Sequence, residues 1–236
     1  MSASSPGSSG SLASIVLPVH NQGDHVAAVV REYEASLARL PVPHEILLVV
    51  NGSSDSSIDV CRDLERALPA VRVLESAEGG WGRAVLLGLE AARGDLLCYT
   101  NLARTRAEDL TLLLLYALVH QNVVVKANRK IRDSLYRRFG SLLYNLECRA
   151  LFDLSFWDIN GTPKVFSRSL GKLLELTRKD DLIDLEFNVI CRREGYRVLE
   201  VPVFSNVRHG GRSTTSHASA LRLDLGALSM WRSRQK

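Results

Sequence analysis

The chain has 236 residues, of which 46% are hydrophobic and 24% are charged, a composition that suits one large soluble domain with a sizeable core. Its net charge of +4 is too small to indicate nucleic-acid binding by itself. The four cysteines are far apart and form no C-x-x-C pair, so we expect neither a disulfide framework nor a zinc site, and a cytoplasmic location is the natural reading.

The N-terminal segment is rich in Ser and Gly and carries neither the basic nor the apolar region of a signal peptide. We therefore expect residues 1–13 to form a disordered lead. Further along, the apolar run Leu112–Leu115 is too short to span a bilayer. If the substrate were a lipid, the protein would have to visit the membrane surface.

Strands and helices are predicted to alternate through the first 127 residues. Apolar runs that predict strands lie at residues 14–19, 45–50, 71–74, 96–100 and 123–127. Segments with helical spacing of apolar residues lie between them, at residues 24–39, 56–68, 81–92 and 107–120. This alternation predicts an α/β domain in which helices flank a mostly parallel central sheet.

The second half of the chain is less regular. Helices are predicted at residues 133–151 and 182–193, and strands at 164–167 and 196–204, with a loop over 153–163. Residues 216–236 predict a basic helical tail. The expected organisation is therefore a lead, one domain over residues 14–215, and this tail.

Three short segments that connect a predicted strand to a helix carry polar or glycine residues: Pro18–Asn21, Asn51–Asp55 and Gly80–Arg83. In a parallel sheet such connections meet at the carboxyl ends of the strands, where nucleotides bind. Glycine lets backbone approach a ligand, and a helix N-terminus favours phosphate oxygens. The dinucleotide fingerprint G-x-G-x-x-G is absent after the first strand. Each segment taken alone could also be an ordinary turn.

The order of these segments resembles that of the nucleotide-sugar domain of inverting family 2 glycosyltransferases, which have the GT-A fold. Val50 and Asn51 stand where that family carries two acids. The resemblance implies that the sugar nucleotide is bound by Pro18, His20, Asn21, Asn51, Ser53, Asp55, Gly80, Gly82, Arg83 and Asn101, together with Arg208 and Ser213 of a closing loop over residues 208–213.

Residues 94–110 match the next family segment at both ends but lack its metal-binding acids. Asn101, Leu102 and Ala103 occupy the D-x-D positions. Because Mg²⁺ and Mn²⁺ prefer anionic oxygen ligands, we expect either ion to bind weakly through Asn101 and mostly through the donor phosphates. Alternatively, Arg104 and Arg106 replace the metal, or they simply form a solvated approach to the next helix.

Six basic side chains fall within thirteen residues, opposed locally only by Asp133: Lys126, Arg129, Lys130, Arg132, Arg137 and Arg138. Aromatic residues are sparse there, which argues against single-stranded nucleic acid and leaves a solvated face or a phosphate-binding wall. Residues 127–146 resemble the acceptor region of polyprenyl-phosphate glycosyltransferases. The resemblance implies that Arg129 and Arg137 or Arg138 bind the lipid phosphate.

Three further residues match the same group. Asp158 and Lys164 keep the spacing of its D-x-x-x-G-[FY]-K loop, and Glu186 matches an acid on a later helix. The resemblance makes all three candidates for the catalytic site, where Lys164 would help Arg83 and Arg208 to offset the diphosphate charge. An Asp158–Lys164 ion pair that braces the loop is the structural alternative.

The sequence thus favours an inverting transferase that moves a sugar from a nucleotide diphosphate to polyprenyl phosphate. An acceptor phosphate is ionised near pH 7 and needs no strong base. A family 2 enzyme with a hydroxyl or amide acceptor would need one, with Asp158 or Glu186 as first candidates. A non-catalytic nucleotide-sugar binder is a third reading, because the D-x-D acids are missing. A cytoplasmic enzyme at the inner membrane face, without nucleic-acid partners, fits the first reading.

Overall fold

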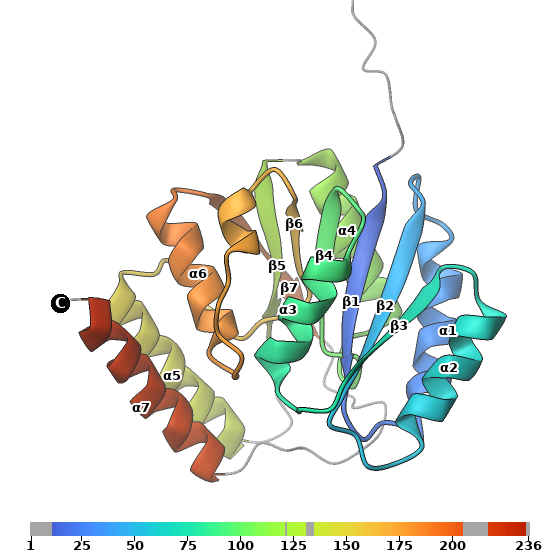
Figure 1. Ribbon diagram of the computed structural model, residues 1–236. Helices are drawn as coiled ribbons and strands as arrows, with labels where there is room; N and C mark the ends of the chain where they lie inside the picture. Colours follow the sequence, from blue (N-terminus) through green and yellow to red (C-terminus); the bar gives the residue numbers. More distant parts are fainter. Residues whose placement is uncertain (1–10, 121, 131–134, 205–216, 235–236) are drawn as a thin grey trace, which may run out of the picture.

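The computed structural model describes residues 11–120, 122–130, 135–204 and 217–234, with side chains described in 11–120, 122–130, 140–204 and 223–233. The chain folds into a seven-stranded sheet between two layers of helices (Figure 1). The strands are β1 (Ala13–Val19), β2 (His44–Asn51), β3 (Val71–Ser76), β4 (Leu96–Tyr99), β5 (Val123–Arg129), β6 (Lys164–Ser167) and β7 (Arg197–Val203).

The helices follow the predicted boundaries closely. They are α1 (Val26–Leu37), α2 (Ser57–Ala67), α3 (Trp81–Ala91), α4 (Ala107–Val119), α5 (Leu135–Phe152), α6 (Ile183–Arg193) and α7 (His217–Arg234), with the short 3₁₀ helix η1 (Gly171–Leu174). Strand β1 begins at Ala13, inside the segment that we predicted to be a disordered lead.

The sheet order is β3-β2-β1-β4-β6-β5-β7, and only β6 is antiparallel to its neighbours. The prediction of a mostly parallel sheet is therefore confirmed. The reversal of β6 has a consequence for the site. Its first residue, Lys164, pairs in register with Tyr99 of β4 and Lys126 of β5. Lys164 therefore lies near the edge at which the parallel strands end.

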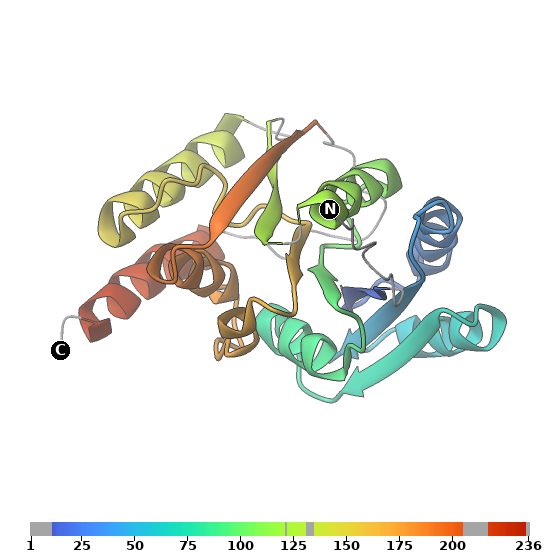
Figure 2. The ribbon, with the colours of Figure 1, turned by 90° about the horizontal axis from the view of Figure 1, so that it is seen from above.

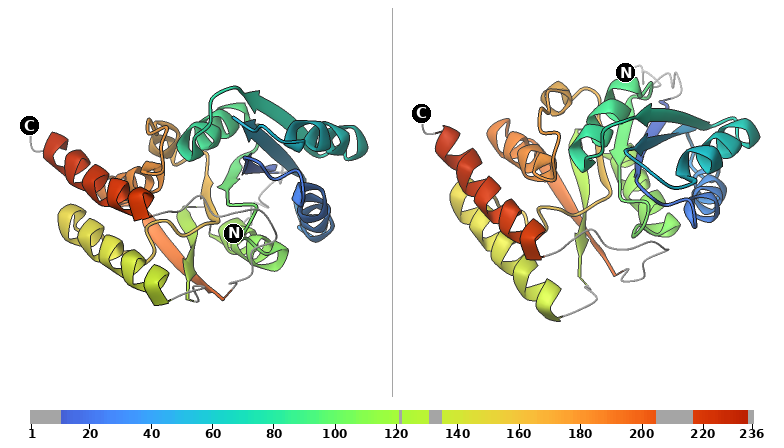
Figure 3. Two further views of the ribbon diagram at one scale, coloured as in Figure 1. Left: turned by 90° about the horizontal axis from the view of Figure 1, so that it is seen from below. Right: turned by 60° about the horizontal axis from the view of Figure 1, so that its bottom comes forward.

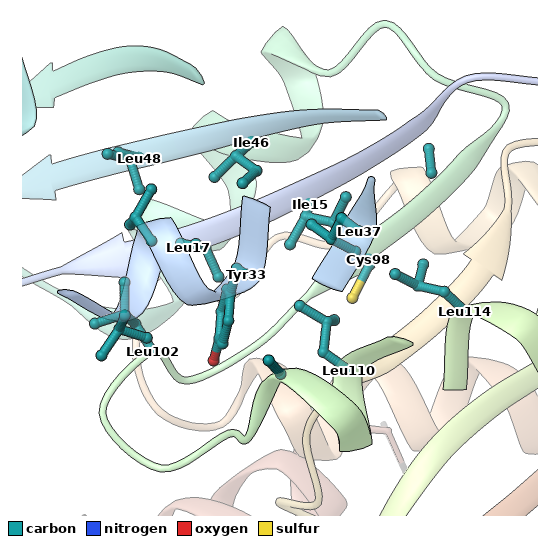
Figure 4. Packing of buried hydrophobic residues seen from close by; sticks show 14 of the residues in the cluster. Ile15, Leu17, Tyr33, Leu37, Ile46, Leu48, Cys98, Leu102, Leu110 and Leu114 are labelled. Atoms are coloured by element: carbon teal, nitrogen blue, oxygen red, sulfur yellow. The ribbon is translucent and has the colours of Figure 1, made fainter. Parts of the chain in front are cut away.

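Each face of the sheet is covered by its own hydrophobic core. Helices α1, α2 and α4 pack on one face, where Tyr33, Leu37 and Leu110 meet the inward residues of β1 and β2 (Figure 4). Helices α3, α5 and α6 contribute to the core on the other face. Figure 2 shows these layers from above. The strands read as continuous apolar runs because both of their faces are buried.

Helices α5 and α7 lie side by side at one end of the molecule (Figures 1 and 3). Ala227 of α7 is fully buried, and a Cβ at Gly226 would lie 2.6 Å from Leu182, so α7 also packs against the start of α6. Among the described residues, no helix is both long and apolar enough to cross a membrane.

Candidate active site

The loops after β1, β2 and β3 converge at the carboxyl edge of the sheet, which Figure 3 shows from below. Asn51, only 3% exposed, links them. Its Nδ2 donates to the carbonyl oxygens of Val19 (3.1 Å) and Val49 (3.3 Å), and its Oδ1 accepts the backbone N–H of Gly80 (3.1 Å). Asn51 therefore fixes the relative positions of the three segments that the sequence singled out, and it does so from a buried position.

Backbone contact between the second and third loops is equally close. A Cβ at Gly52, whose φ is +55°, would lie 2.7 Å from the nitrogen of Gly79. His20 reaches across from the first loop, and its Nδ1 donates to the carbonyl of Asn51 at 2.8 Å. The glycines are thus required by the packing of loop against loop, and His20 stays exposed at the surface of this junction.

Polar side chains join the first two loops along their exposed side. Asn21, in the left-handed region with φ 51°, accepts the N–H of Ser54 at its Oδ1 (2.8 Å) and donates its own N–H to Ser53 Oγ (3.1 Å). Asp55 accepts the N–H of Gly23 (3.0 Å) and that of Ser57 (3.0 Å). Burial raises the pKa of Asp55, but a hydrogen bond from the Ser57 hydroxyl and these two backbone bonds hold it below its usual value. Pro18 lies buried within β1, and its contact with a nucleotide stays a prediction.

The first turn of α3 packs against the segment that precedes α6. A Cβ at Gly82 would lie 2.4 Å from the carbonyl oxygen of Arg178 and 2.6 Å from that of Asp180. The N–H of Arg83 donates to Lys179 O at 3.0 Å, so one amide of this helix N-terminus is already bonded to protein. The Arg83 side chain pairs with Glu78, and its buried Nε has no hydrogen-bond acceptor among the described residues.

The turn at the D-x-D position is closed on itself. Asn101 Oδ1 accepts the N–H of Ala103 at 3.0 Å, and the side chains of Leu102 and Ala103 are buried. Thr100 and Thr105 bond to each other through their hydroxyls at 2.6 Å. Arg106 pairs with Glu108 at 3.2 Å on the surface. The described residues contain no cluster of three or more His, Cys, Asp or Glu side chains that could hold a metal ion.

Lys164 and Asp158, which the sequence offered as a pair, have different partners. Lys164 is completely buried and its ammonium pairs with Asp184 of α6. Burial lowers the pKa of Lys164, and Asp184 opposes that effect. This buried, paired ammonium is not open to solvent, so the arrangement does not support the expected contact of Lys164 with a diphosphate, which stays a prediction.

Asp158 instead holds Arg129, the last residue of β5. Its carboxylate accepts Nε (2.8 Å), Nη2 (2.8 Å) and the backbone N–H (3.0 Å) of Arg129. Asp158 is 3% exposed, whereas the Arg129 side chain is 27% exposed. This bidentate fork fixes the plane of the guanidinium on a side chain that is still partly exposed.

Lys126 is the second basic residue of this region with an unexpected partner. Its ammonium donates to Asn188 Oδ1 at 2.9 Å and lies 3.4 Å from Glu200, and burial lowers the pKa of Lys126 to about 8. Of the three cations in this cluster whose side chains the structure describes, two are therefore neutralised by Glu200 and Asp158 from distant parts of the chain. Lys130 is exposed.

Glu186 lies on the outer side of α6. Its carboxylate accepts the N–H and hydroxyl of Thr177 (3.0 and 2.7 Å) and the N–H of Arg178 (2.9 Å), so it braces the segment before the helix. Asp184, two residues earlier, points to the opposite side, since residues two apart do not share a helix face. The acid that reaches the interior is Asp184, which sequence reasoning missed.

Four predicted ligands lie beyond what the structure describes. The side chains of Arg137 and Arg138 belong to the first turn of α5 but lie outside the described side chains, and Arg208 and Ser213 fall outside the described residues altogether. Their roles stay predictions.

Residues 14–170, about two thirds of the chain, match the sequence profile described as Glycosyl transferase family 2. The chain belongs to this family. Family 2 membership agrees with the fold, which the chain shares with glucosyl-3-phosphoglycerate synthase from Mycobacterium tuberculosis. The complex of that protein with UDP has a TM-score of 0.72 at 16% identity, over 96% of this chain and 81% of the other. A complex with Mn²⁺, UDP and glucosyl-3-phosphoglycerate gives 0.73. The family 2 chain thus has a GT-A fold.

Curated relatives of this family 2 chain are named undecaprenyl-phosphate 4-deoxy-4-formamido-L-arabinose transferase. The protein from Pseudomonas fluorescens (strain SBW25) is 27% identical over 207 residues, covering 86% of this chain and 60% of the relative. The one from Pseudomonas syringae pv. syringae (strain B728a) is 31% identical over 185 residues, covering 76% and 54%. The chain therefore spans between half and two thirds of the length of these relatives.

Proposed function

We propose that the chain transfers a sugar, with inversion, from a nucleotide diphosphate to a polyprenyl phosphate. The observation that carries the proposal is the Arg129–Asp158 fork at the end of β5. It fixes an arginine whose side chain is partly exposed at the carboxyl edge of the sheet, the same edge at which the loops expected to hold the donor lie. The undecaprenyl-phosphate transferases to which the chain is similar have an acceptor that such a group would bind.

The donor would lie over the junction of the first three loops. His20, Asn21 and Asp55 are exposed there, and Gly52 and Gly79 bring two backbones together below them. The buried Nε of Arg83 lacks an acceptor among the described residues, which a diphosphate oxygen could supply if Glu78 moved aside. Similarity in fold to a protein whose crystals hold UDP supports the same placement.

A phosphate acceptor suits the carboxylates at this edge. Each of the three that could serve as a base is already engaged: Asp158 by Arg129, Glu186 by Thr177 and Arg178, and Asp184 by Lys164. A hydroxyl or amide acceptor would require one of them to accept a proton. An ionised phosphate needs only alignment with the sugar carbon and neutralisation of the departing diphosphate.

The turn at Asn101 does not fit a tightly held divalent cation. Its one oxygen ligand is a neutral amide that already accepts the N–H of Ala103, and the neighbouring D-x-D positions are buried and apolar. The M. tuberculosis synthase binds Mn²⁺ together with UDP. We infer that in this chain any Mg²⁺ or Mn²⁺ is held mainly by the donor phosphates.

A lipid acceptor implies contact with a membrane, and helix α5 offers a surface for it. Leu142, Leu143 and Leu146 are 49%, 53% and 51% exposed on its outer side, on the helix that begins soon after Arg129 and Lys130. Basic residues beside an apolar face suit an anionic lipid surface. We propose that this face of α5 rests on the cytoplasmic side of a membrane while the chain reaches its acceptor.

The alternative of a non-catalytic nucleotide-sugar binder has the missing D-x-D acids in its favour. An assay with radiolabelled UDP- and GDP-sugars, with and without polyprenyl phosphate, distinguishes these possible functions. Transfer into a lipid-extractable product that depends on polyprenyl phosphate supports the proposal. Nucleotide binding without transfer or hydrolysis would identify a binder, and transfer to a hydroxyl compound instead would identify the other enzyme class.

A further inference from the structure

Asp184 connects several elements at the edge of the sheet. It is 5% exposed, and its carboxylate receives donors from three other elements. Oδ1 accepts the hydroxyl of Tyr99 on β4 (3.0 Å) and pairs with the ammonium of Lys164 on β6. Oδ2 accepts the indole N–H of Trp81, the first residue of α3, at 3.1 Å. The carboxylate of α6 is thus joined to both neighbouring strands and to the helix that opens the proposed donor site.

The Trp81 bond is one of several that hold the first turn of α3, where the N–H of Arg83 also donates to the carbonyl oxygen of Lys179. On one side the N–H of Gly80 donates to buried Asn51, which belongs to the loop after β2. On the other side the indole of Trp81 is tied to Asp184 and packs edge-on against Tyr99, with ring centroids 6.3 Å apart. The turn between these two anchors therefore owes its position to Asp184 as much as to Asn51.

The engagement of both oxygens argues against Asp184 as a proton acceptor. A general base needs a free lone pair directed at the nucleophile, within about 3 Å of it or through one water. Here Oδ1 has two donors, one of them a buried ammonium that would lose its counter-ion if the carboxylate were protonated. Lys164 also lies 5.5 and 5.7 Å from the ring centroids of Tyr99 and Phe187, so the pair is enclosed by aromatic side chains.

We propose that Asp184 is a positioning residue that holds the donor-binding turn Gly80–Arg83 through the indole N–H of Trp81. The inference rests on the proposed function in so far as this turn contacts the donor diphosphate. It assigns Asp184 no contact with the substrate. Lys164 serves here as the counter-ion of that carboxylate and holds it in place. Trp81 is the link between that buried pair and the site.

Two double variants separate the effect of the hydrogen-bond acceptor for Trp81 from the effect of the buried charges. In the amide variant, Lys164→Met is combined with Asp184→Asn, which removes both charges but leaves an amide oxygen for the Trp81 N–H. In the leucine variant, Lys164→Met is combined with Asp184→Leu, which removes that oxygen as well and keeps the branched shape of the side chain. Asp153→Asn, an exposed Asp to Asn change, is the control outside the site. Trp81→Phe removes the donor while it keeps an aromatic ring against Tyr99, and it gives an independent answer should a double variant not fold.

Binding of UDP and GDP is measured by titration calorimetry, and folding by melting temperature. The amide variant should bind nucleotide within about threefold of wild type, and the leucine variant and Trp81→Phe about tenfold more weakly, as expected for one lost hydrogen bond. Equal affinities of the leucine variant, the amide variant and Trp81→Phe, with unchanged melting temperatures, would overturn the inference alone. A wild-type chain that binds no nucleotide overturns the proposed function, and this inference with it.

Discussion

At the scale of single residues, Asn51 has a structural role at a position of the family motif. It stands where the family motif that this segment resembles has an acid, and here its Nδ2 donates to two carbonyl oxygens, those of Val19 and Val49, from a buried position. A carboxylate in its place would face two acceptors without a proton to give. The chain therefore uses this position to build the loop junction, and an acid would weaken that junction.

Asn51→Asp should lower the free energy of unfolding by about 2–4 kcal/mol, because a buried carboxylate would lose two hydrogen bonds and face two carbonyl oxygens. Urea denaturation followed by circular dichroism measures the change. Asn122→Asp, the same substitution at an exposed position, is the control and should cost almost nothing. Equal stability of Asn51→Asp and wild type would show that the side chain does not hold the junction.

Asn101 supplies the prediction about metal ions. Asn101→Asp would place one anionic oxygen at the D-x-D turn, so Mn²⁺ should bind the nucleotide complex more tightly, and transfer should depend more steeply on the ion. The wild-type chain should lose activity only gradually on chelation. Complete loss on chelation, together with stoichiometric Mn²⁺ binding without nucleotide, would contradict this account of the turn.

At the scale of secondary-structure elements, two close approaches place the site. Helix α3 lies against β1 at Gly88, where a Cβ would be 2.2 Å from Val16 Cγ1, and against the segment before α6 at Gly82. Both glycines allow α3 to present its first turn at the strand ends. The apolar periodicity of the sequence predicted helix α3. It did not show which glycine of the helix lies against another backbone.

Gly82→Ala should destabilise the fold by about 1–3 kcal/mol and weaken nucleotide binding, because the added methyl would meet the carbonyl oxygens of Arg178 and Asp180. Gly140→Ala in α5 is the matched control. A Cβ there has nothing within 4 Å, so the change should be neutral or stabilise the helix by up to about 1 kcal/mol. If the two variants have the same stability and the same nucleotide affinity, the packing of α3 at Gly82 does not position the turn Gly80–Arg83.

The exposed leucines of α5 give the prediction for membrane contact. Replacing Leu142, Leu143 and Leu146 by Ser should reduce flotation with anionic phospholipid vesicles about tenfold or more, because each leucine would contribute apolar area to the contact. The control carries serine at Leu112, Leu115 and Val119, which are 42%, 40% and 77% exposed on α4. If the α4 variant lost flotation and the α5 variant floated like wild type, the membrane contact would lie on the opposite layer of helices.

At the scale of the whole molecule, local sequence patterns predicted the helices and strands but not the ion pairs. Helix and strand boundaries follow from apolar spacing and turns, which are local. Arg129 meets Asp158 twenty-nine residues away, and Trp81 meets Asp184 after 103, because the reversed strand β6 and helix α6 bring them together. Charge density alone suggested a basic wall at residues 126–138, whereas the fold supplies Glu200 and Asp158 as counter-ions.

The central claim is transfer to a phosphate acceptor held by Arg129. The decisive measurement is the rate of sugar transfer to polyprenyl phosphate, as a function of acceptor concentration, for wild type and for Arg129→Gln combined with Asp158→Asn. This pair removes both charges, so no carboxylate is left unpaired in the interior. The account predicts wild-type transfer, and in the variant an apparent acceptor affinity roughly ten- to a hundredfold weaker with nucleotide affinity nearly unchanged. Loss of nucleotide binding with acceptor dependence intact would assign Arg129 to the donor and contradict the account.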